Sequence, residues 1–87
     1  MDSIKEISNL ISKIGSENEV YEFISELLTE SEISTLSKRW RILKMLSEGR
    51  TQRDIAKELN VSLCKVTRGS RILKDENAIV YKLIKEN

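Results

Sequence analysis

Proline and histidine are absent from this sequence of 87 residues, which contains one cysteine and three glycines. One cysteine excludes a disulfide framework, and the lack of histidine removes the usual zinc patterns and the imidazole that serves most often as a general base. The sequence also lacks a phosphate-binding glycine loop and a cluster of acids in an apolar setting. We therefore expect neither an enzyme nor a metal site.

Long apolar runs are missing as well. No stretch approaches the roughly 18 apolar residues that a membrane-spanning helix needs. The first residues, MDSIKEISNL, do not show the basic start and unbroken apolar core of a secretory signal. We expect a cytoplasmic protein with no membrane partner.

The residues that are present favour helices. Leucine, isoleucine, lysine, glutamate and serine occur throughout, and there are no runs of alternating β-branched and polar residues. The fold class expected is all-α. A chain of this size is near the length at which one hydrophobic core supplies only a few kcal/mol, so association with a second copy would add needed apolar burial.

The net charge of +1 hides a strong segregation of charge along the chain. Residues 1–34 carry eight acids and two bases, whereas residues 35–74 carry eleven bases and three acids. A basic block of this kind, between acidic ends, is typical of a surface that binds nucleic acid phosphates. Charge alone slightly favours the alternative of a dipolar domain with solvated faces.

Apolar periodicity and helix-capping residues predict one domain of six short helices. Ser16 with Glu19 and Thr29 with Glu32 form two capping boxes, and Gly15 is the expected stop of the first helix. Within the single domain, 1–87, we expect dimerisation helices in 1–28, a long central helix at 29–48, a helix-turn-helix at 52–73 and a C-terminal helix at 76–86. Thr51 and Ser62 are the expected caps of the two short helices, and Gly49 ends the central one. The predicted buried stripe of the central helix consists of Ile33, Leu36, Trp40, Leu43 and Leu46.

Residues 52–71, QRDIAKELNVSLCKVTRGSR, have the helix-turn-helix pattern. Ala56 is small where the second helix crosses, Asn60 tolerates the left-handed conformation of the turn, and Val61 and Val66 close the corner. Such a pair presents its second helix to the major groove of DNA. The residues expected at bases or phosphates are Arg53, Lys57, Leu63, Cys64, Lys65, Thr67, Ser70, Arg71 and Lys74.

Gly69 is unusual, because a glycine inside a helix costs about 1 kcal/mol relative to alanine. In a helix-turn-helix the position three residues after Val66 normally holds a bulky aliphatic side chain. Removing that side chain leaves a void unless a ligand occupies it. Arg68 and Arg39 are placed to hold a flat ring between their guanidinium planes, and a guanidinium also pairs well with a carboxylate. We therefore expect a ligand pocket beside the reading helix.

Two segments, LLTESEISTLSKRWRI at 27–42 and EGRTQRDIAKELNVSLCKVTRGSRILK at 48–74, resemble the Trp repressor family. The resemblance covers about residues 20–74, and TRGS after a helix-turn-helix is its most specific element. It implies an intertwined, all-helical homodimer that represses tryptophan biosynthesis or transport genes by binding double-stranded operator DNA with L-tryptophan as corepressor.

The resemblance also implies roles for five residues. Arg39 and Arg68 match the arginines on the two faces of the indole, and Gly69 matches the glycine that leaves room for the ring. Arg68 and the hydroxyl of Thr29 match groups that meet the ligand carboxylate. Leu28 matches the leucine whose carbonyl, from the other subunit, accepts from the ligand amino group.

Three departures from the family pattern leave a second interpretation open. The turn before Gln52 is one residue shorter, Ile72 replaces a serine near the ligand amino group, and Ala56 replaces a basic residue. The alternative is a DNA-binding protein of the same family that responds to another small aromatic ligand or to none. A helical protein-binding module without a DNA partner is the third class.

Overall fold

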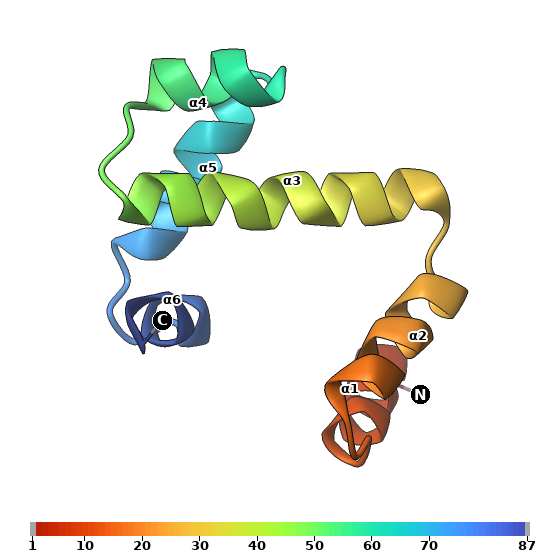
Figure 1. The fold of residues 1–87 in the computed structure, drawn as a ribbon. Helices are drawn as coiled ribbons and strands as arrows, with labels where there is room; N and C mark the ends of the chain where they lie inside the picture. Colours follow the sequence, from red (N-terminus) through yellow and green to blue (C-terminus); the bar gives the residue numbers. More distant parts are fainter. Residues whose placement is uncertain (1, 87) are drawn as a thin grey trace. The chain divides into compact units, whose positions relative to one another are not determined.

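The computed structural model describes residues 2–86, and this part of the chain is all-helical, without strands. The six helices are α1 Ser3–Ser12, α2 Glu17–Leu27, α3 Glu30–Ser47, α4 Gln52–Leu59, α5 Leu63–Leu73 and α6 Ile79–Glu86 (Figure 1). They form two compact units, one of residues 1–33 and one of residues 34–87. The predicted all-α fold class is confirmed. None of the described helices combines the length and apolar character required to cross a bilayer.

Capping residues set most of the helix starts, as the sequence predicts. The side chains of Ser16, Thr51 and Ser62 each accept a hydrogen bond from the backbone N–H three residues later. Asp2 caps α1 in the same way, which the sequence analysis did not anticipate. These bonds satisfy N–H groups that have no partner within the first turn of a helix.

Two predicted helix ends are wrong. Gly15 does not stop the first helix, since α1 ends at Ser12, with Lys13 as its cap in a right-handed conformation, and Gly15 has no positive φ. The last helix begins at Ile79 and not at residue 76. The Asp75 side chain accepts the N–H of Asn77 at 2.9 Å, and this local turn takes the place of the expected first helical turn.

Thr29 and Glu32 form a reciprocal capping box at the start of α3. The Glu32 N–H donates to the Thr29 hydroxyl at 3.1 Å, and the Thr29 N–H donates to the Glu32 carboxylate at 2.8 Å. The backbone bond from Thr29, followed by the side-chain bond, lowers the pKa of Glu32 below its ordinary value of 4.5. The ionised carboxylate is therefore the form that the folded helix stabilises.

This capping box makes stability depend on pH in a defined direction. A depressed folded-state pKa gives stabilisation that is complete above the unfolded value of 4.5 and is lost as pH falls through the folded value. We expect the melting temperature of the wild type to exceed that of Glu32→Gln near neutral pH, and the gap to narrow as the pH falls below 4.5 and through the lowered pKa of Glu32. Thermal unfolding followed by circular dichroism at several pH values measures the gap. A constant gap over the whole range would contradict the role of the charge.

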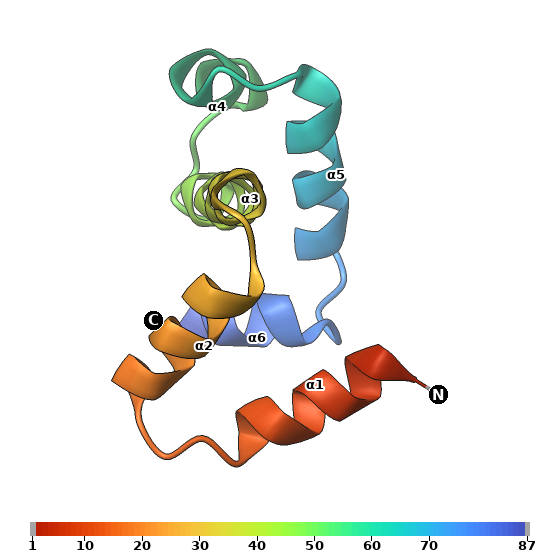
Figure 2. The same ribbon diagram turned by 90° about the vertical axis from the view of Figure 1, so that its right-hand side faces the viewer.

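The core of residues 34–87 lies where α4 and α5 pack on the C-terminal half of α3. Ile42 and Met45 of α3 meet Ile55 of α4 and Val66 of α5, with exposed fractions of 4% or less. Figure 2 shows α4, α5 and α6 following one another around this half of α3. The packing of these four side chains holds the two short helices at a defined position, because neither helix is long enough to be stable alone.

The predicted buried stripe of α3 is only partly correct. Leu43 is buried, but Leu36 and Trp40 are 46% and 40% exposed, and the other buried positions are Ile42 and Met45. The reason is that α4 and α5 cover the C-terminal half of α3, on the face that carries Ile42 and Met45. Leu36 and Trp40 lie N-terminal to Ile42, with Leu36 the farther of the two, and they share an uncovered face of α3.

Residues 1–33 contain two amphipathic helices without a core of their own. Neither α1 nor α2 has a buried residue. Four of their large apolar side chains are half exposed or more, namely those of Ile4, Leu10, Tyr21 and Leu27. Exposed apolar faces of this kind mark surfaces that associate with another protein surface.

Candidate nucleic-acid interface and ligand pocket

The turn between α4 and α5 has the geometry of a helix-turn-helix. Asn60 ends α4 in the left-handed conformation, with φ 54° and ψ 52°, as the sequence predicts. The Val61 N–H donates to the Ala56 carbonyl at 3.0 Å, which closes the end of α4. Ala56 and Val61 pack around the buried core, and Ser62 then caps α5. The turn sets α5 at an angle to α4 (Figure 2).

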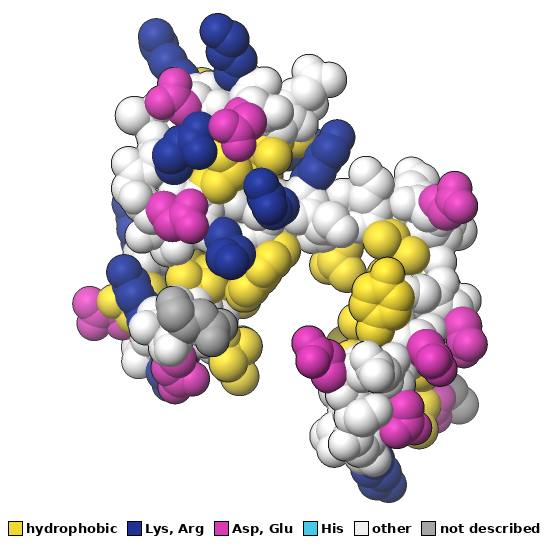
Figure 3. All heavy atoms as spheres, in the orientation of Figure 1, with side chains coloured by type: hydrophobic (Ala, Val, Ile, Leu, Met, Phe, Trp, Pro, Cys, Tyr) yellow, Lys and Arg dark blue, Asp and Glu magenta, His cyan; other side chains and the backbone are white. Residues whose placement is uncertain are grey.

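The outer face of α5 carries most of the residues predicted to contact DNA. A shallow hollow of about 260 Å³ is lined by Leu63, Cys64, Thr67, Arg68 and Arg71. Lys65 and Lys74 are exposed on the same helix or at its end, and Arg53 and Lys57 are exposed on α4. This surface can meet phosphates and place the first turns of α5 in a groove. The opposite face, seen in Figure 3 with α3 in front of α5, also carries Lys and Arg side chains around α4 and the C-terminal half of α3.

Two of the predicted DNA contacts are half-buried, Thr67 and Ser70. The single proton of the Thr67 hydroxyl is shared between two acceptors, Gln52 Oε1 and the Leu63 carbonyl, each 3.0 Å from the hydroxyl oxygen. Gln52 is not among the site residues that the sequence predicts. Its only sequence signal is its place directly after the cap Thr51.

An ion pair between Arg50 and Glu58 was also not anticipated. The Arg50 guanidinium donates to the Glu58 carboxylate at 3.0 Å, and both side chains are partly exposed. This bond raises the pKa of Arg50, chiefly through the hydrogen bond and then through the charge of Glu58. It joins the loop before α4 to the last turn of that helix. The two residues are eight positions apart, and no short-range sequence pattern predicts an ion pair at that spacing.

Gly69 is buried, but the space beside it is occupied by α3. A Cβ atom at Gly69 would lie 2.9 Å from Ile42 Cγ2, and within 3.5 Å of Leu46 Cδ1 and Leu43 Cδ2. The expectation of an open void at this point of the chain is therefore wrong. The physical reason is that α5 approaches α3 closely at the glycine, so the side chains of α3 fill the position.

The remaining ligand candidates are distributed as follows. Arg39 and Arg68 are both exposed, and Arg68 lines the hollow on α5 whereas Arg39 does not. The hydroxyl of Thr29 accepts from Glu32 and acts as a helix cap. Leu28 is the C-cap of α2 in an extended conformation, with ψ 148°. The roles of these residues and of Gly69 toward a ligand remain predictions.

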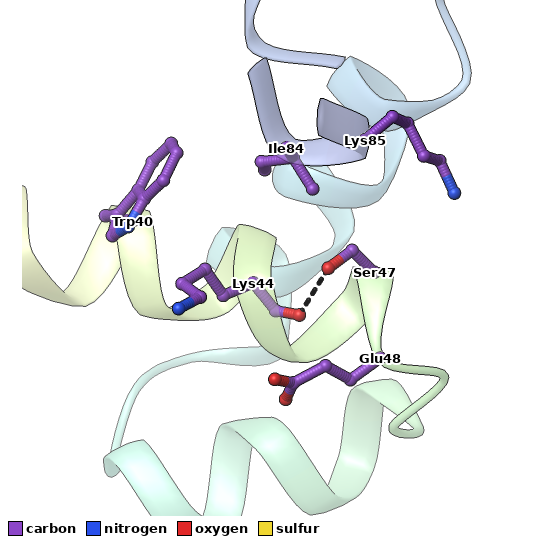
Figure 4. Close-up of a pocket in the computed structure, with 6 residues that line it drawn as sticks. All are labelled: Trp40, Lys44, Ser47, Glu48, Ile84 and Lys85. Atoms are coloured by element: carbon purple, nitrogen blue, oxygen red, sulfur yellow. Dashed lines mark hydrogen bonds between the residues drawn. The ribbon is translucent and has the colours of Figure 1, made fainter. Parts of the chain in front are cut away.

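A larger cavity of about 520 Å³ lies between α3 and α6 (Figure 4). Trp40 and Ile84 supply apolar surface, and Lys44, Ser47, Glu48 and Lys85 supply polar groups. The Ser47 hydroxyl donates to the Lys44 carbonyl at 2.6 Å, so it is engaged within α3. No group of acidic or cysteine side chains in residues 2–86 is arranged to hold a metal ion.

The turn geometry and the basic face of α5 together define a helix-turn-helix DNA-binding protein. The chain matches the family described as Trp repressor protein over residues 2–87. It therefore belongs to the Trp repressor family, whose members are regulatory DNA-binding proteins and not enzymes.

Relatives of known name agree with this assignment. A Trp operon repressor homolog of Chlamydia trachomatis is 39% identical over 66 residues, which are 75% of this chain and 70% of the relative. One from Chlamydia caviae is 38% identical over 66 residues, 75% of this chain and 65% of the relative. One from Xylella fastidiosa is 35% identical over 69 residues, 78% of this chain and 75% of the relative. No solved structure matches the chain.

Proposed function

We propose that this protein is a homodimeric, cytoplasmic repressor that binds operator DNA when L-tryptophan is bound, and that it controls genes of tryptophan biosynthesis or transport. The observation that carries the proposal is the helix-turn-helix of α4 and α5, whose outer face holds Arg68, Arg71 and Lys65, in a chain of the Trp repressor family. The relatives are named as Trp operon repressor homologs, which supports tryptophan as the effector.

The ligand contacts proposed are Arg39, Arg68, Gly69, Thr29 and Leu28. Two guanidinium groups suit the faces of an indole ring and the carboxylate of an amino acid. Ligand bound between α3 and α5 would displace the α3 side chains that fill the position beside Gly69, and it would fix the angle of α5. It would thereby raise the population in which two reading helices of a dimer lie about 34 Å apart, the spacing of successive major grooves.

Coupling between ligand and DNA is the direct test. We expect L-tryptophan to tighten binding to a selected operator duplex at least tenfold, which corresponds to about 1.4 kcal/mol of coupling. Fluorescence anisotropy at one fixed salt concentration measures both affinities, because phosphate contacts make them salt-dependent. Equal affinities with and without tryptophan would exclude the switch.

Dimerisation is proposed from the uncovered apolar faces. Leu36, Trp40, Ile79 and Leu83 are 40% exposed or more within residues 34–87, as are Ile4 and Tyr21 within residues 1–33. A second copy of the chain would bury such surface at about 25 cal/mol per Å². The same association would place two copies of α5 on a two-fold-symmetric operator.

A charge on this face should break the dimer. We expect Leu36→Glu to be monomeric and to lose operator affinity, because an unpaired carboxylate would be buried at the interface. The matched control is Ser37→Glu, the same charge on an exposed polar position of the same helix. Light scattering after size-exclusion chromatography reads out the mass. A dimeric Leu36→Glu protein would contradict the proposed interface.

The packing at Gly69 favours one alternative. Because α3 side chains occupy the position beside Gly69, the chain has a filled core there without any ligand. The alternative is a DNA-binding member of the family that takes another small aromatic acid or none. A thermal-shift screen of amino acids and indole acids separates the two, since a ligand that binds the folded state raises its melting temperature.

A further inference from the structure

One side-chain hydrogen bond joins α4 to α5 within residues 2–86. Gln52, the first residue of α4, accepts at Oε1 from the Thr67 hydroxyl on the second turn of α5, at 3.0 Å. Both residues are half-buried. The bond therefore lies at the edge of the helix-turn-helix core, next to the hollow that Thr67 lines with Leu63 and Arg71.

The hydroxyl of Thr67 has its donor capacity engaged inside the protein. It has one proton, and it lies 3.0 Å from Gln52 Oε1 and 3.0 Å from the Leu63 carbonyl. A direct contact in which Thr67 donates to a base acceptor would have to break these bonds. The side chain also holds a single orientation, because both acceptors lie on fixed helices.

Apolar packing turns the side of α5 that carries Val66 and Gly69 toward the core, and it does so without a directional bond. Ile55 and Val66 set the distance between α4 and α5, but contacts between aliphatic side chains are non-directional. A hydrogen bond depends on distance and angle. The Gln52–Thr67 bond is thus a directional side-chain contact between α4 and α5, and it adds to the packing in holding the outer face of α5.

We infer that Gln52 is a positioning residue for DNA recognition, which holds the reading face of α5 through Thr67 and itself touches no base. In this arrangement Thr67 contributes to base selection through its bond to Gln52. The inference rests on the proposed function, in which α5 reads operator DNA, and it adds a residue outside the predicted contact set.

The test compares Gln52→Ala, Thr67→Val, the double variant and Thr67→Ser, which retains the hydroxyl. The probes are a duplex selected by the wild type from a randomised library with L-tryptophan in excess, and an unselected duplex of equal length. The measured quantity is the ratio of the two affinities at one salt concentration. Circular dichroism confirms that each variant is folded at the assay temperature.

We expect Gln52→Ala and Thr67→Val each to lower this ratio about three- to tenfold, the range of one hydrogen bond. The double variant should be no worse than either single variant, since both remove the same bond. Thr67→Ser should retain the wild-type ratio. The salt dependence of binding should be the same for Gln52→Ala as for the wild type, because no phosphate contact is lost.

Four results would overturn the inference. A full loss on Thr67→Val in the Gln52→Ala background would show that Thr67 contacts the base directly. A smaller salt dependence for Gln52→Ala would show that Gln52 binds a phosphate. Unchanged ratios in a selective protein would leave the proposed function intact and refute the positioning role, whereas a wild type that selects no duplex would refute both.

Discussion

Replacing Ile55 by alanine is expected to destabilise the helix-turn-helix by about 3 kcal/mol, within the range of about 2–5 measured for large-to-small changes in protein cores. Ile55 is fully buried, and it contacts the α3 and α5 parts of the core. Domains of this size are stable by only about 5–15 kcal/mol, so the loss is a large share of the total.

Urea unfolding followed by circular dichroism measures this effect at a single protein concentration, since a dimer unfolds in a concentration-dependent way. Lys57→Ala is the matched control, because Lys57 is on the same helix but exposed. Its stability should stay within about 0.5 kcal/mol of the wild type. If Ile55→Ala lowered the free energy of unfolding by less than about 1 kcal/mol, the core around Ile55 would be less tightly packed than in the structure.

The second large effect concerns Gly69→Leu. Alanine-like Cβ geometry already brings an atom to 2.9 Å from Ile42 Cγ2, and Ile42 is only 2% exposed, so its methyl group has no free space. A leucine adds three further carbon atoms. Overpacking of this kind costs about 1–3 kcal/mol, and the better helix propensity of leucine offsets less than about 1 kcal/mol. We expect a net loss of about 2 kcal/mol without ligand.

A compensating change checks the cause of this loss. In an Ile42→Ala background, Gly69→Leu should cost at least about 1 kcal/mol less than in the wild type, because the clashing methyl group is gone. Gly15→Ala serves as a control for the removal of a glycine, since nothing lies within 4 Å of its added Cβ. If Gly69→Leu did not lower the free energy of unfolding in urea, the position beside Gly69 would be an open pocket and not a filled one.

Short-range signals in the sequence predicted much of the fold. The caps Ser16, Thr29, Thr51 and Ser62 act within three residues, so their effect is readable without tertiary information. The left-handed turn at Asn60 is local in the same sense. The helix-turn-helix pattern and the basic block of residues 35–74 also predicted the exposed basic residues of α5.

Features that depend on long-range packing were not predicted. Ile42 and Met45 are buried because α4 and α5 cover that part of α3, whereas periodicity alone assigned Leu36 and Trp40 to the buried side. The Gln52–Thr67 bond spans 15 residues, and no local rule connects the two positions.

By itself the sequence determined the all-helical class, the helix-turn-helix and the basic block, because helix capping, turn conformation and charge are properties of residues a few positions apart. Only the tertiary structure decided what surrounds Gly69 and what orients α5. Both depend on how closely two helices approach, and that distance is set by side chains far apart in the chain.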